Sequence, residues 1–314
     1  MQETLVVALG GNAILRPGQR GTAEEQRDNL RQTGRQLVRL IQRGHRIVVT
    51  HGNGPQVGAI LLQQEAGQAH GVAAMPLDVC GAQSQGLLGY LIQQTLYNEL
   101  VRANIEKSVV TVLTQTVVDP DDPAFSHPTK PIGPFYTEQE AKALAQRTGH
   151  VYVEDAGRGW RRVVPSPDPV AIVEAQTIRD LVEAGVVVIA VGGGGIPVVR
   201  EAGYSLVGVE AVIDKDLAAA RLAVQVHADR LLVLTDVPRV YLGYRTPRQR
   251  PLTRVTVAEA RRYMEAGEFA PGSMGPKVRA CVEFVEQTGR PAIITALERL
   301  EQAVYGDEGT TFVP

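Results

Sequence analysis

Leu5-Val-Val-Ala-Leu-Gly-Gly-Asn12, near the start of a chain of 314 residues, sets the pattern on which the rest of the sequence is built. Five consecutive apolar residues without polar alternation predict a strand buried on both faces, as in a parallel sheet covered by helices. The two glycines that follow permit a sharp turn and let a ligand approach the backbone. A strand, a glycine turn and a helix start together predict a site for an anion.

The same arrangement occurs twice more. Ile47–Thr50 leads into His51-Gly-Asn-Gly54, and Val186–Val191 leads into four glycines at 192–195. Ligands of such sheets bind at the carboxyl ends of the strands, so we expect the three turns to meet there. Three anion sites indicate a ligand with several negative groups, which we interpret as phosphates. The candidate backbone contacts are Gly10, Gly11, Gly52, Gly54, Gly193 and Gly194.

Strands alternate with helices along most of the chain, which predicts an α/β fold with a mostly parallel sheet and helices on both faces. The alternation breaks at residues 118–169, where five prolines fall between Asp119 and Pro134. Two strand-like runs, at 151–153 and 162–164, predict a hairpin joined by Ala156–Gly159. We interpret 118–169 as an inserted subdomain that projects from the sheet edge. The alternative is a disordered linker. A helix is then expected from Ala171 through Val182.

Composition excludes several classes of protein. A formal net charge of -2 gives no reason to expect nucleic acid or an anionic membrane as a partner. No apolar run approaches the roughly 20 residues that a bilayer requires. Leu5 opens the first strand directly, so no signal peptide is expected. Cys80 and Cys281 are expected to be buried thiols of a cytoplasmic protein, with a disulfide or metal site as the alternative.

Lysines are the strongest candidates for chemistry, because phosphoryl transfer needs cations around the transferring group. Lys277 follows a glycine-rich turn at a helix start, Lys215 begins another helix, and Lys130 lies in the insert. Each has a surface position as its alternative. Asp214 and Asp216 are placed to orient the lysines and Mg²⁺, or else to cap the helix.

Further polar residues follow the strands. Asn12 and Asn53 each close a glycine turn, and are interpreted either as ligand contacts or as residues that tolerate a left-handed turn. Thr235-Asp236 closes a strand in the C-terminal half, where a base or ribose is expected. The helix at 79–102 is rich in small residues, which favours either a dimer face or packing within the chain.

Five ordered motifs that cover essentially the whole chain resemble those of the carbamate kinases, within the amino acid kinase superfamily. They are Val7–Ala13, Thr50–Gly58, Val191–Pro197, Ala211–Asp216 and Gly272–Lys277. The resemblance implies a three-layer αβα open sandwich with a small protruding insert and a homodimer. It implies an N-terminal lobe, 1–200, that binds carbamate or carbamoyl phosphate, and a C-terminal lobe, 201–314, that binds ATP or ADP. It also implies reversible, Mg²⁺-dependent phosphoryl transfer between ATP and carbamate.

The resemblance also assigns roles to residues. Lys215 and Lys277 would neutralise the transferring group, organised by Asp216, and Lys130 would reach the carbamoyl end. No protein ligand of the metal is expected with confidence, and no strong base is required, because the carboxylate-like acceptor is already anionic. The nucleotide-binding residues would be Gly193, Gly194, Lys215, Thr235, Asp236, Met274, Gly275 and Lys277.

One position separates the carbamate kinases from their relatives. Many of these, such as acetylglutamate kinase, carry a lysine two residues before the first glycine pair, where this chain has Ala8. The alternatives to a carbamate kinase are a glutamate or aspartate kinase of the same fold, a non-catalytic nucleotide sensor, and a dinucleotide-dependent oxidoreductase. The oxidoreductase is disfavoured because no Gly-x-Gly-x-x-Gly follows the first strand.

Overall fold

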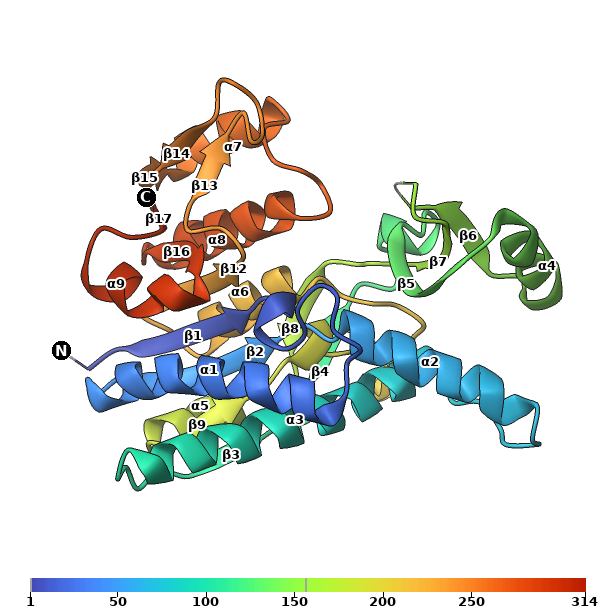
Figure 1. Ribbon diagram of the computed structural model, residues 1–314, viewed down its shortest axis with the longest axis horizontal. Helices are drawn as coiled ribbons and strands as arrows, with labels where there is room; N and C mark the ends of the chain where they lie inside the picture. The colour runs from blue at the N-terminus through green and yellow to red at the C-terminus, as the bar shows by residue number, and fades with distance from the viewer. Residues whose placement is uncertain (1, 156) are drawn as a thin grey trace.

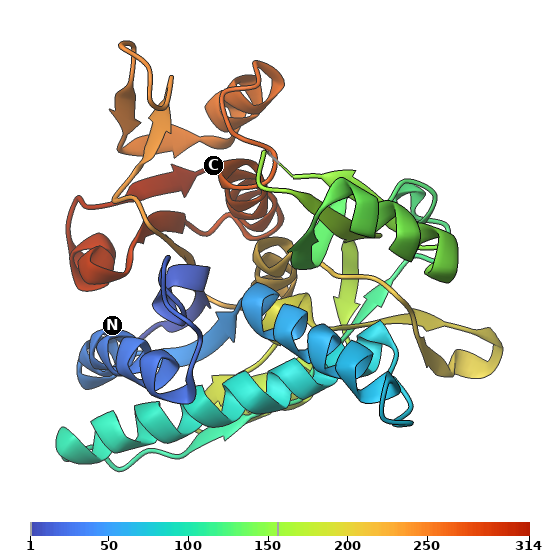
Figure 2. The same cartoon turned by 45° about the vertical axis from the view of Figure 1, so that its right-hand side comes forward.

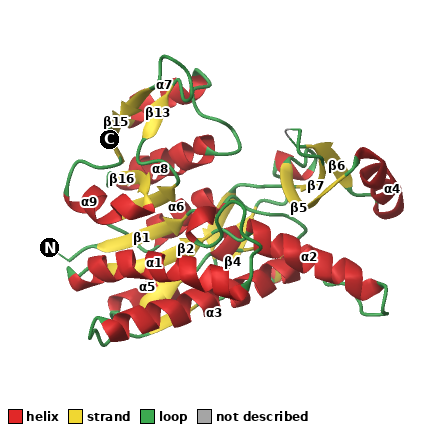
Figure 3. Cartoon of the chain, viewed as in Figure 1, coloured by secondary structure: helices red, strands yellow, loops and turns green. Residues whose placement is uncertain are grey.

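The computed structural model describes residues 2–155 and 157–314. Its centre is an eight-stranded sheet in the order β15-β17-β16-β12-β1-β2-β9-β3, parallel except where β17 meets β16 (Figures 1 and 3). The strands, in sheet order, are Arg254–Thr256, Thr310–Val313, Ala292–Ala296, Arg230–Thr235, Thr4–Leu9, Arg46–His51, Val187–Ile189 and Val109–Thr111. The predicted α/β class and mostly parallel sheet are confirmed.

Strand β1 lies between β12 and β2 and is buried along its whole length. Successive side chains of a strand point to opposite faces. Leu5 and Val7 therefore join a core on the side of α1 (Ala23–Gln42) and α3 (Leu77–Arg102), and Val6 joins the core on the side of α6 (Lys215–Gln225) and α8 (Met274–Thr288). Two helical layers thus enclose the sheet, and the unbroken apolar run of β1 follows from that enclosure.

The remaining helices are α2 (Gly54–Gln68), α4 (Glu138–Thr148), α5 (Ala175–Glu183), α7 (Val257–Glu265) and α9 (Leu300–Tyr305). Capping boxes begin three of these helices, at Thr22, Thr137 and Thr256. Pro55 occupies the first turn of α2, where its missing N–H leaves no helical hydrogen bond unmade. The first glycine turn behaves differently, since it leads into a short 3-10 helix at Gly11–Ala13 rather than directly into α1.

A second sheet of four strands, in the order β11-β10-β4-β8, corrects one prediction. Its strands are Leu206–Gly208, Ile196–Arg200, Gln115–Val118 and Pro169–Ile172. The helix expected from Ala171 begins only at Ala175, because residues 169–172 pair as β8 with β4. Val170 and Ile172 are β-branched residues that suit such a strand.

The insert leaves this second sheet between Val118 and Pro169, which face each other across β4 and β8. It is ordered: β5 (Lys130–Tyr136), β7 (Trp160–Val164) and β6 (Val151–Glu154) form an antiparallel sheet beside α4. The expected hairpin is therefore present, although Ala156 in its turn lies outside the described residues. Figures 1 and 2 show the insert projecting from the body next to α2.

Three further observations bear on the sequence predictions. Both cysteines are buried and free, as predicted. Among the residues that the structure describes, no helix has the length and apolar character needed to cross a membrane. An antiparallel pair that the sequence analysis did not identify, β13 (Val240–Leu242) with β14 (Arg250–Leu252), lies near α7 at the C-terminal end of the molecule.

Candidate active site

The three glycine turns meet at one edge of the central sheet. Strands β1, β2 and β9 are parallel neighbours, so their carboxyl ends lie side by side. A cleft of about 370 Å³ opens there and is lined from each turn, by Gly11, by Gly52, Asn53 and Gly54, and by Gly193. Backbone N–H groups of such turns are suited to bind anions.

Lys215 and Lys277 line this cleft and share one carboxylate. The Nζ atom of Lys215 lies 2.6 Å from Oδ1 of Asp216, and Nζ of Lys277 lies 2.8 Å from Oδ2. Lys215 and Asp216 begin α6, whereas Lys277 comes from the first turn of α8. Two helices packed on the same face of the sheet thus bring together residues 61 positions apart.

Asp216 is 3 % exposed, and its ionisation depends on the lysines. Burial by itself raises the pKa of this carboxyl, but Lys215 and Lys277 outweigh burial and hold its pKa at about 2. Burial lowers the pKa of Lys215 more than its partners raise it, while for Lys277 the pairing with Asp216 outweighs burial and the pKa is raised. The carboxylate therefore remains charged at neutral pH and fixes both ammonium groups.

Lys130 enters the cleft from the opposite side, at the first residue of β5. Its Nζ lies 3.0 Å from Oδ2 of Asp214. The other oxygen of Asp214 accepts the backbone N–H of Asp216 and so caps α6. Both readings of Asp214 thus apply, because one carboxylate caps the helix and orients a lysine. Three ammonium groups face two carboxylates, which leaves the cluster one positive charge in excess.

Gly52 and Gly193 each lie very close to a side chain that lines the cleft. A side chain at Gly52 would meet the stem of Lys215, with Cβ 3.0 Å from Cδ. Gly193 has a φ of +66°, and a Cβ there would lie 2.2 Å from Nδ2 of Asn53. The turns after β2 and β9 therefore pack directly on residues that line the cleft. A side chain at Gly52 would displace Lys215, and one at Gly193 would clash with Asn53 and strain the backbone.

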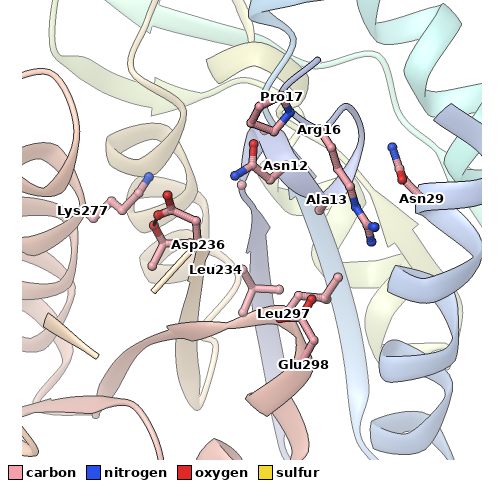
Figure 4. Close-up of a pocket in the computed structure, with 13 residues that line it drawn as sticks. Asn12, Ala13, Arg16, Pro17, Asn29, Leu234, Asp236, Lys277, Leu297 and Glu298 are labelled. Atoms are coloured by element: carbon pink, nitrogen blue, oxygen red, sulfur yellow. Dashed lines mark hydrogen bonds between the residues drawn. The ribbon is translucent and has the colours of Figure 1, made fainter. Parts of the chain in front are cut away.

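A second cleft, of about 390 Å³, adjoins the first at Lys277 and Gly11. Figure 4 shows Lys277 and Asp236 to the left of Asn12, with Arg16 to its right. Thr235 also lines this cleft, at the end of β12. A third cavity of about 650 Å³ continues from Asp236 to Tyr244, Phe269 and Met274. Together the three spaces form a path from Lys130 past Lys277 to Met274.

The structure separates some of the predicted nucleotide contacts from this path. Gly193 lies with Asn53 in the first cleft, away from Thr235 and Asp236. Gly194 is packed against the Ile213 carbonyl, which an added Cβ would approach to 2.4 Å. Gly275 lies at the start of α8, and its N–H donates to the Ala270 carbonyl. Gly10 lines the second cleft beside Gly11.

Comparison with known proteins agrees with this geometry. A sequence profile described as the amino acid kinase family matches residues 3–296. This chain belongs to the amino acid kinase family. It is 56 % identical to a carbamate kinase of Pyrococcus horikoshii and 55 % identical to one of Pyrococcus furiosus, over 100 % of each chain. The resemblance to carbamate kinases is therefore confirmed, and the chain is a kinase.

The solved structures give the same result. A carbamate kinase from Giardia lamblia bound to AMP-PNP superposes with a TM-score of 0.93 at 47 % identity, covering 99 % of this chain and 98 % of the other. The expected amino acid kinase fold is thus shown. Ala8 is completely buried in β1, and Lys215 lies in the cleft that the glycine turns line.

Sequence reasoning missed the residues behind the turns. Gln85 of α3 is 2 % exposed; its amide donates to the carbonyls of Thr114 and Gly192, and its Oε1 accepts the N–H of Thr114. Thr114 Oγ1 accepts the N–H of Val191, a β-branched residue with a φ of +53°. These bonds hold the strained entry to the four-glycine turn. In the sequence, Gln85 is one glutamine among several in a helix.

Two further polar residues support the turn after β2. Asn53 Nδ2 donates to Ser84 Oγ at 2.7 Å, so α3 fixes the orientation of the Asn53 amide. His51 is fully buried below Gly192, and its Nδ1 donates to the Gly52 carbonyl at 3.0 Å. Burial lowers the pKa of His51 to about 4, so the imidazole is neutral at pH 7. Its place at the end of a buried strand, directly before the glycine turn, is the signal that could have identified it.

Proposed function

We propose that this chain is a carbamate kinase, which transfers a phosphoryl group reversibly between ATP and carbamate with Mg²⁺. The observation that carries the proposal is the cluster of Lys130, Lys215 and Lys277 around a small cleft at the strand ends. The full-length likeness to carbamate kinases supports the choice of substrate, and the AMP-PNP of the Giardia enzyme supports the nucleotide.

In this proposal Lys215 and Lys277 stabilise the transferring group. Charge accumulates on its oxygens during transfer, and cations that are already in place lower the barrier because no reorganisation is needed. Asp216 holds both ammonium groups in place, because its buried carboxylate pairs with Lys215 and with Lys277. Since the attacking oxygen is anionic in either direction, the site needs no strong general base.

The carbamoyl end would lie against the glycine turns. Gly11, Gly52 and Gly54 line the first cleft, and its volume of about 370 Å³ suits a small substrate. Asn53 would add a side-chain contact, and Gly10 and Asn12 would act where the two clefts join. Lys130 would neutralise the carbamoyl phosphate from the insert, with Asp214 orienting it.

The nucleotide would occupy the second and third cavities. Its phosphates would lie near Lys277 and Asn12, and its base and ribose near Thr235, Asp236 and Met274. In this assignment the carbamoyl end lies mainly on residues 1–200 and the base and ribose lie on residues 201–314, while the nucleotide phosphates lie between the two lobes. Gly194 and Gly275 are not among the proposed nucleotide contacts, because each packs against a backbone carbonyl.

Mg²⁺ would be held mainly by the nucleotide phosphates and water. Within the described residues, no three His, Cys, Asp or Glu side chains gather in a metal-binding group. The carboxylates nearest the first cleft, Asp214 and Asp216, are both engaged by lysines. The metal supplies positive charge between the phosphates, and this chain's lysines supply the rest.

A homodimer through α3 also forms part of the proposal. One face of this helix exposes Leu87, Tyr90, Tyr97 and Val101, each between 42 and 55 % exposed. These positions recur at helical spacing and carry no charge, which is typical of a surface that a second copy covers. Light scattering is expected to give a dimer for the wild-type chain and a monomer for Tyr90→Glu/Tyr97→Glu.

The deciding experiment is ATP formation from Mg-ADP and carbamoyl phosphate by the purified protein. Acetyl phosphate serves as the control donor. Rapid formation of ATP from carbamoyl phosphate alone would support the proposal. Absence of ATP while Mg-ADP still binds would reject it and leave a different acyl acceptor or a nucleotide sensor.

A further inference from the structure

A separate cavity lies between α2 and the insert, which run side by side in Figures 1 and 2. Its volume is about 360 Å³, within the range of small-molecule sites. Ile132 lines both this cavity and the catalytic cleft, and so forms the partition between them. The catalytic lysines do not line it, and the proposed phosphoryl transfer does not use it.

The floor of the cavity is apolar and one wall is closed by an ion pair. Leu61 of α2, Met75 and Ile132 contribute apolar surface. Arg162 of β7 pairs with Glu210 at 2.8 Å, so these two charges neutralise each other. Burial lowers the pKa of His150, which is therefore neutral at pH 7 and adds no charge. The remaining charges decide what the cavity can bind.

Those charges are Glu65 on α2 and Arg147 in the last turn of α4. Within the part of the chain that the structure describes, neither has an oppositely charged side chain within 4.0 Å. An unpaired carboxylate and an unpaired guanidinium thus border one cavity.

Two tyrosines stand beside these charges. The rings of Tyr136 and Tyr152 meet edge to face, with centroids 5.8 Å apart, and Tyr136 Oη donates to Glu65 at 3.5 Å. Burial and then Glu65 raise the pKa of Tyr136 to about 12, and Arg147 acts on Tyr152 in the opposite sense to Glu65. A carboxylate, two phenol groups and a guanidinium therefore line the same cavity.

From this arrangement we propose that the cavity binds a free α-amino acid as a zwitterion. The ammonium group lies at Glu65 against the face of a tyrosine ring, a position that favours cations. The carboxylate is bound by Arg147, whose guanidinium suits carboxylates. The side chain of the ligand covers the apolar floor at Leu61 and Met75.

Binding would also reach the catalytic cleft through β5. This strand runs from Lys130, which lines the catalytic cleft, to Tyr136, which lines the amino acid cavity. A ligand that ties Glu65 to Arg147 holds the insert against α2, and thereby sets the position of Lys130. This effect on the KM for carbamoyl phosphate rests on the proposed function, whereas binding itself does not.

The test is calorimetric titration of the full chain, without nucleotide, with L-leucine, L-glutamate and L-arginine in turn. At least one is expected to bind once per chain, and Glu65→Gln and Arg147→Gln are each expected to weaken it about tenfold, the loss of one charge-assisted hydrogen bond. Lys142→Gln and Glu138→Gln are matched controls, because they form an exposed pair on α4 outside the cavity.

No binding of any of the three, or affinities unchanged in both cavity variants, would overturn the proposal. A second measurement follows the KM for carbamoyl phosphate with and without the bound amino acid. An unchanged KM despite binding would remove the coupling through β5 and leave the site. If the protein forms no ATP at all, the proposed function fails while the calorimetric result still decides the site.

Discussion

The two sides of the catalytic cleft hold their lysines in different ways. Lys215 and Lys277 stand on helices of the main body and share Asp216, and their side chains are 17 and 12 % exposed. Lys130 stands on the small sheet of the insert, is 36 % exposed, and pairs with Asp214 alone. The difference teaches that the charge proposed for the transferring group is fixed by the main body, whereas the position of the third lysine depends on where the insert lies.

The attachment of the insert explains the contrast. Its sheet rests on the body through one small apolar cluster, in which Ile132 and Val164 meet Val57 and Leu77. The strands that carry the glycine turns are instead buried between two helical layers. Less buried apolar surface gives less resistance to displacement, so the insert is the part expected to adjust when substrate binds.

The largest effect is expected from removing a lysine that the main body fixes. Lys277→Ala should lower turnover about a thousandfold or more, because a cation aimed at the transferring group is lost. The fold should remain, since Asp216 keeps its bond to Lys215. Steady-state ATP formation and a thermal melt measure the two effects. Lys142→Ala, an exposed lysine of the insert, is the control, and normal turnover of Lys277→Ala would refute the assigned role.

The next prediction concerns Asp216, which fixes the positions of Lys215 and Lys277. Asp216→Asn leaves two largely buried ammonium groups without their carboxylate and should lower the free energy of unfolding by on the order of 3 kcal/mol. Urea denaturation at neutral pH measures this change. Glu138→Gln, which removes an exposed pair with Lys142, should cost less than about 0.5 kcal/mol. Equal losses in the two variants would show that the body holds its charges no more firmly than the insert.

A smaller effect, measured as stability against pH, tests the role of His51, which is buried behind the glycine turns. The folded pKa of His51 is about 4, below the roughly 6.5 of an unfolded histidine, so the unfolded chain takes up the proton first. Stability contributed by His51 is therefore complete above pH 6.5 and is lost as the pH falls toward 4. Between pH 8 and 5 the wild type should lose about 2 kcal/mol more than His51→Gln. Parallel curves for the two proteins would contradict a buried neutral imidazole.

The sequence predicts the sheet and the cluster well because both depend on local signals. The short apolar run of β1, which ends at a glycine pair, favours a strand buried on both faces, and capping boxes mark helix starts through bonds within three residues. Lys215 and Lys277 are identifiable because each stands in the first turn of a helix, Lys215 between two aspartates and Lys277 shortly after a glycine-rich turn. Lys130 carries a weaker signal, because it is marked only by its place in the proline-rich insert. These features can be recognised in the sequence without knowing which segments contact one another in the fold.

The parts that sequence could not predict depend on contacts between distant segments. The helix expected from Ala171 begins later because residues 169–172 pair with β4, a partner that the local sequence does not reveal. Gln85 is unremarkable in its helix, and only the fold brings it to Thr114 and Gly192. The packing of Gly194 against Ile213 likewise joins segments that nothing local connects, and for this reason its glycine looked like a phosphate contact.

The account proposes that Lys130 of the insert acts on carbamoyl phosphate and not on the nucleotide. The two Michaelis constants of Lys130→Ala test this proposal most directly. In ATP formation from Mg-ADP and carbamoyl phosphate, the KM for carbamoyl phosphate should rise about tenfold, as expected for one partly exposed charge, and the KM for Mg-ADP should stay unchanged. Lys142→Ala, on the same insert, should alter neither. A change confined to the KM for Mg-ADP would contradict the account, because it would place the insert lysine on the nucleotide.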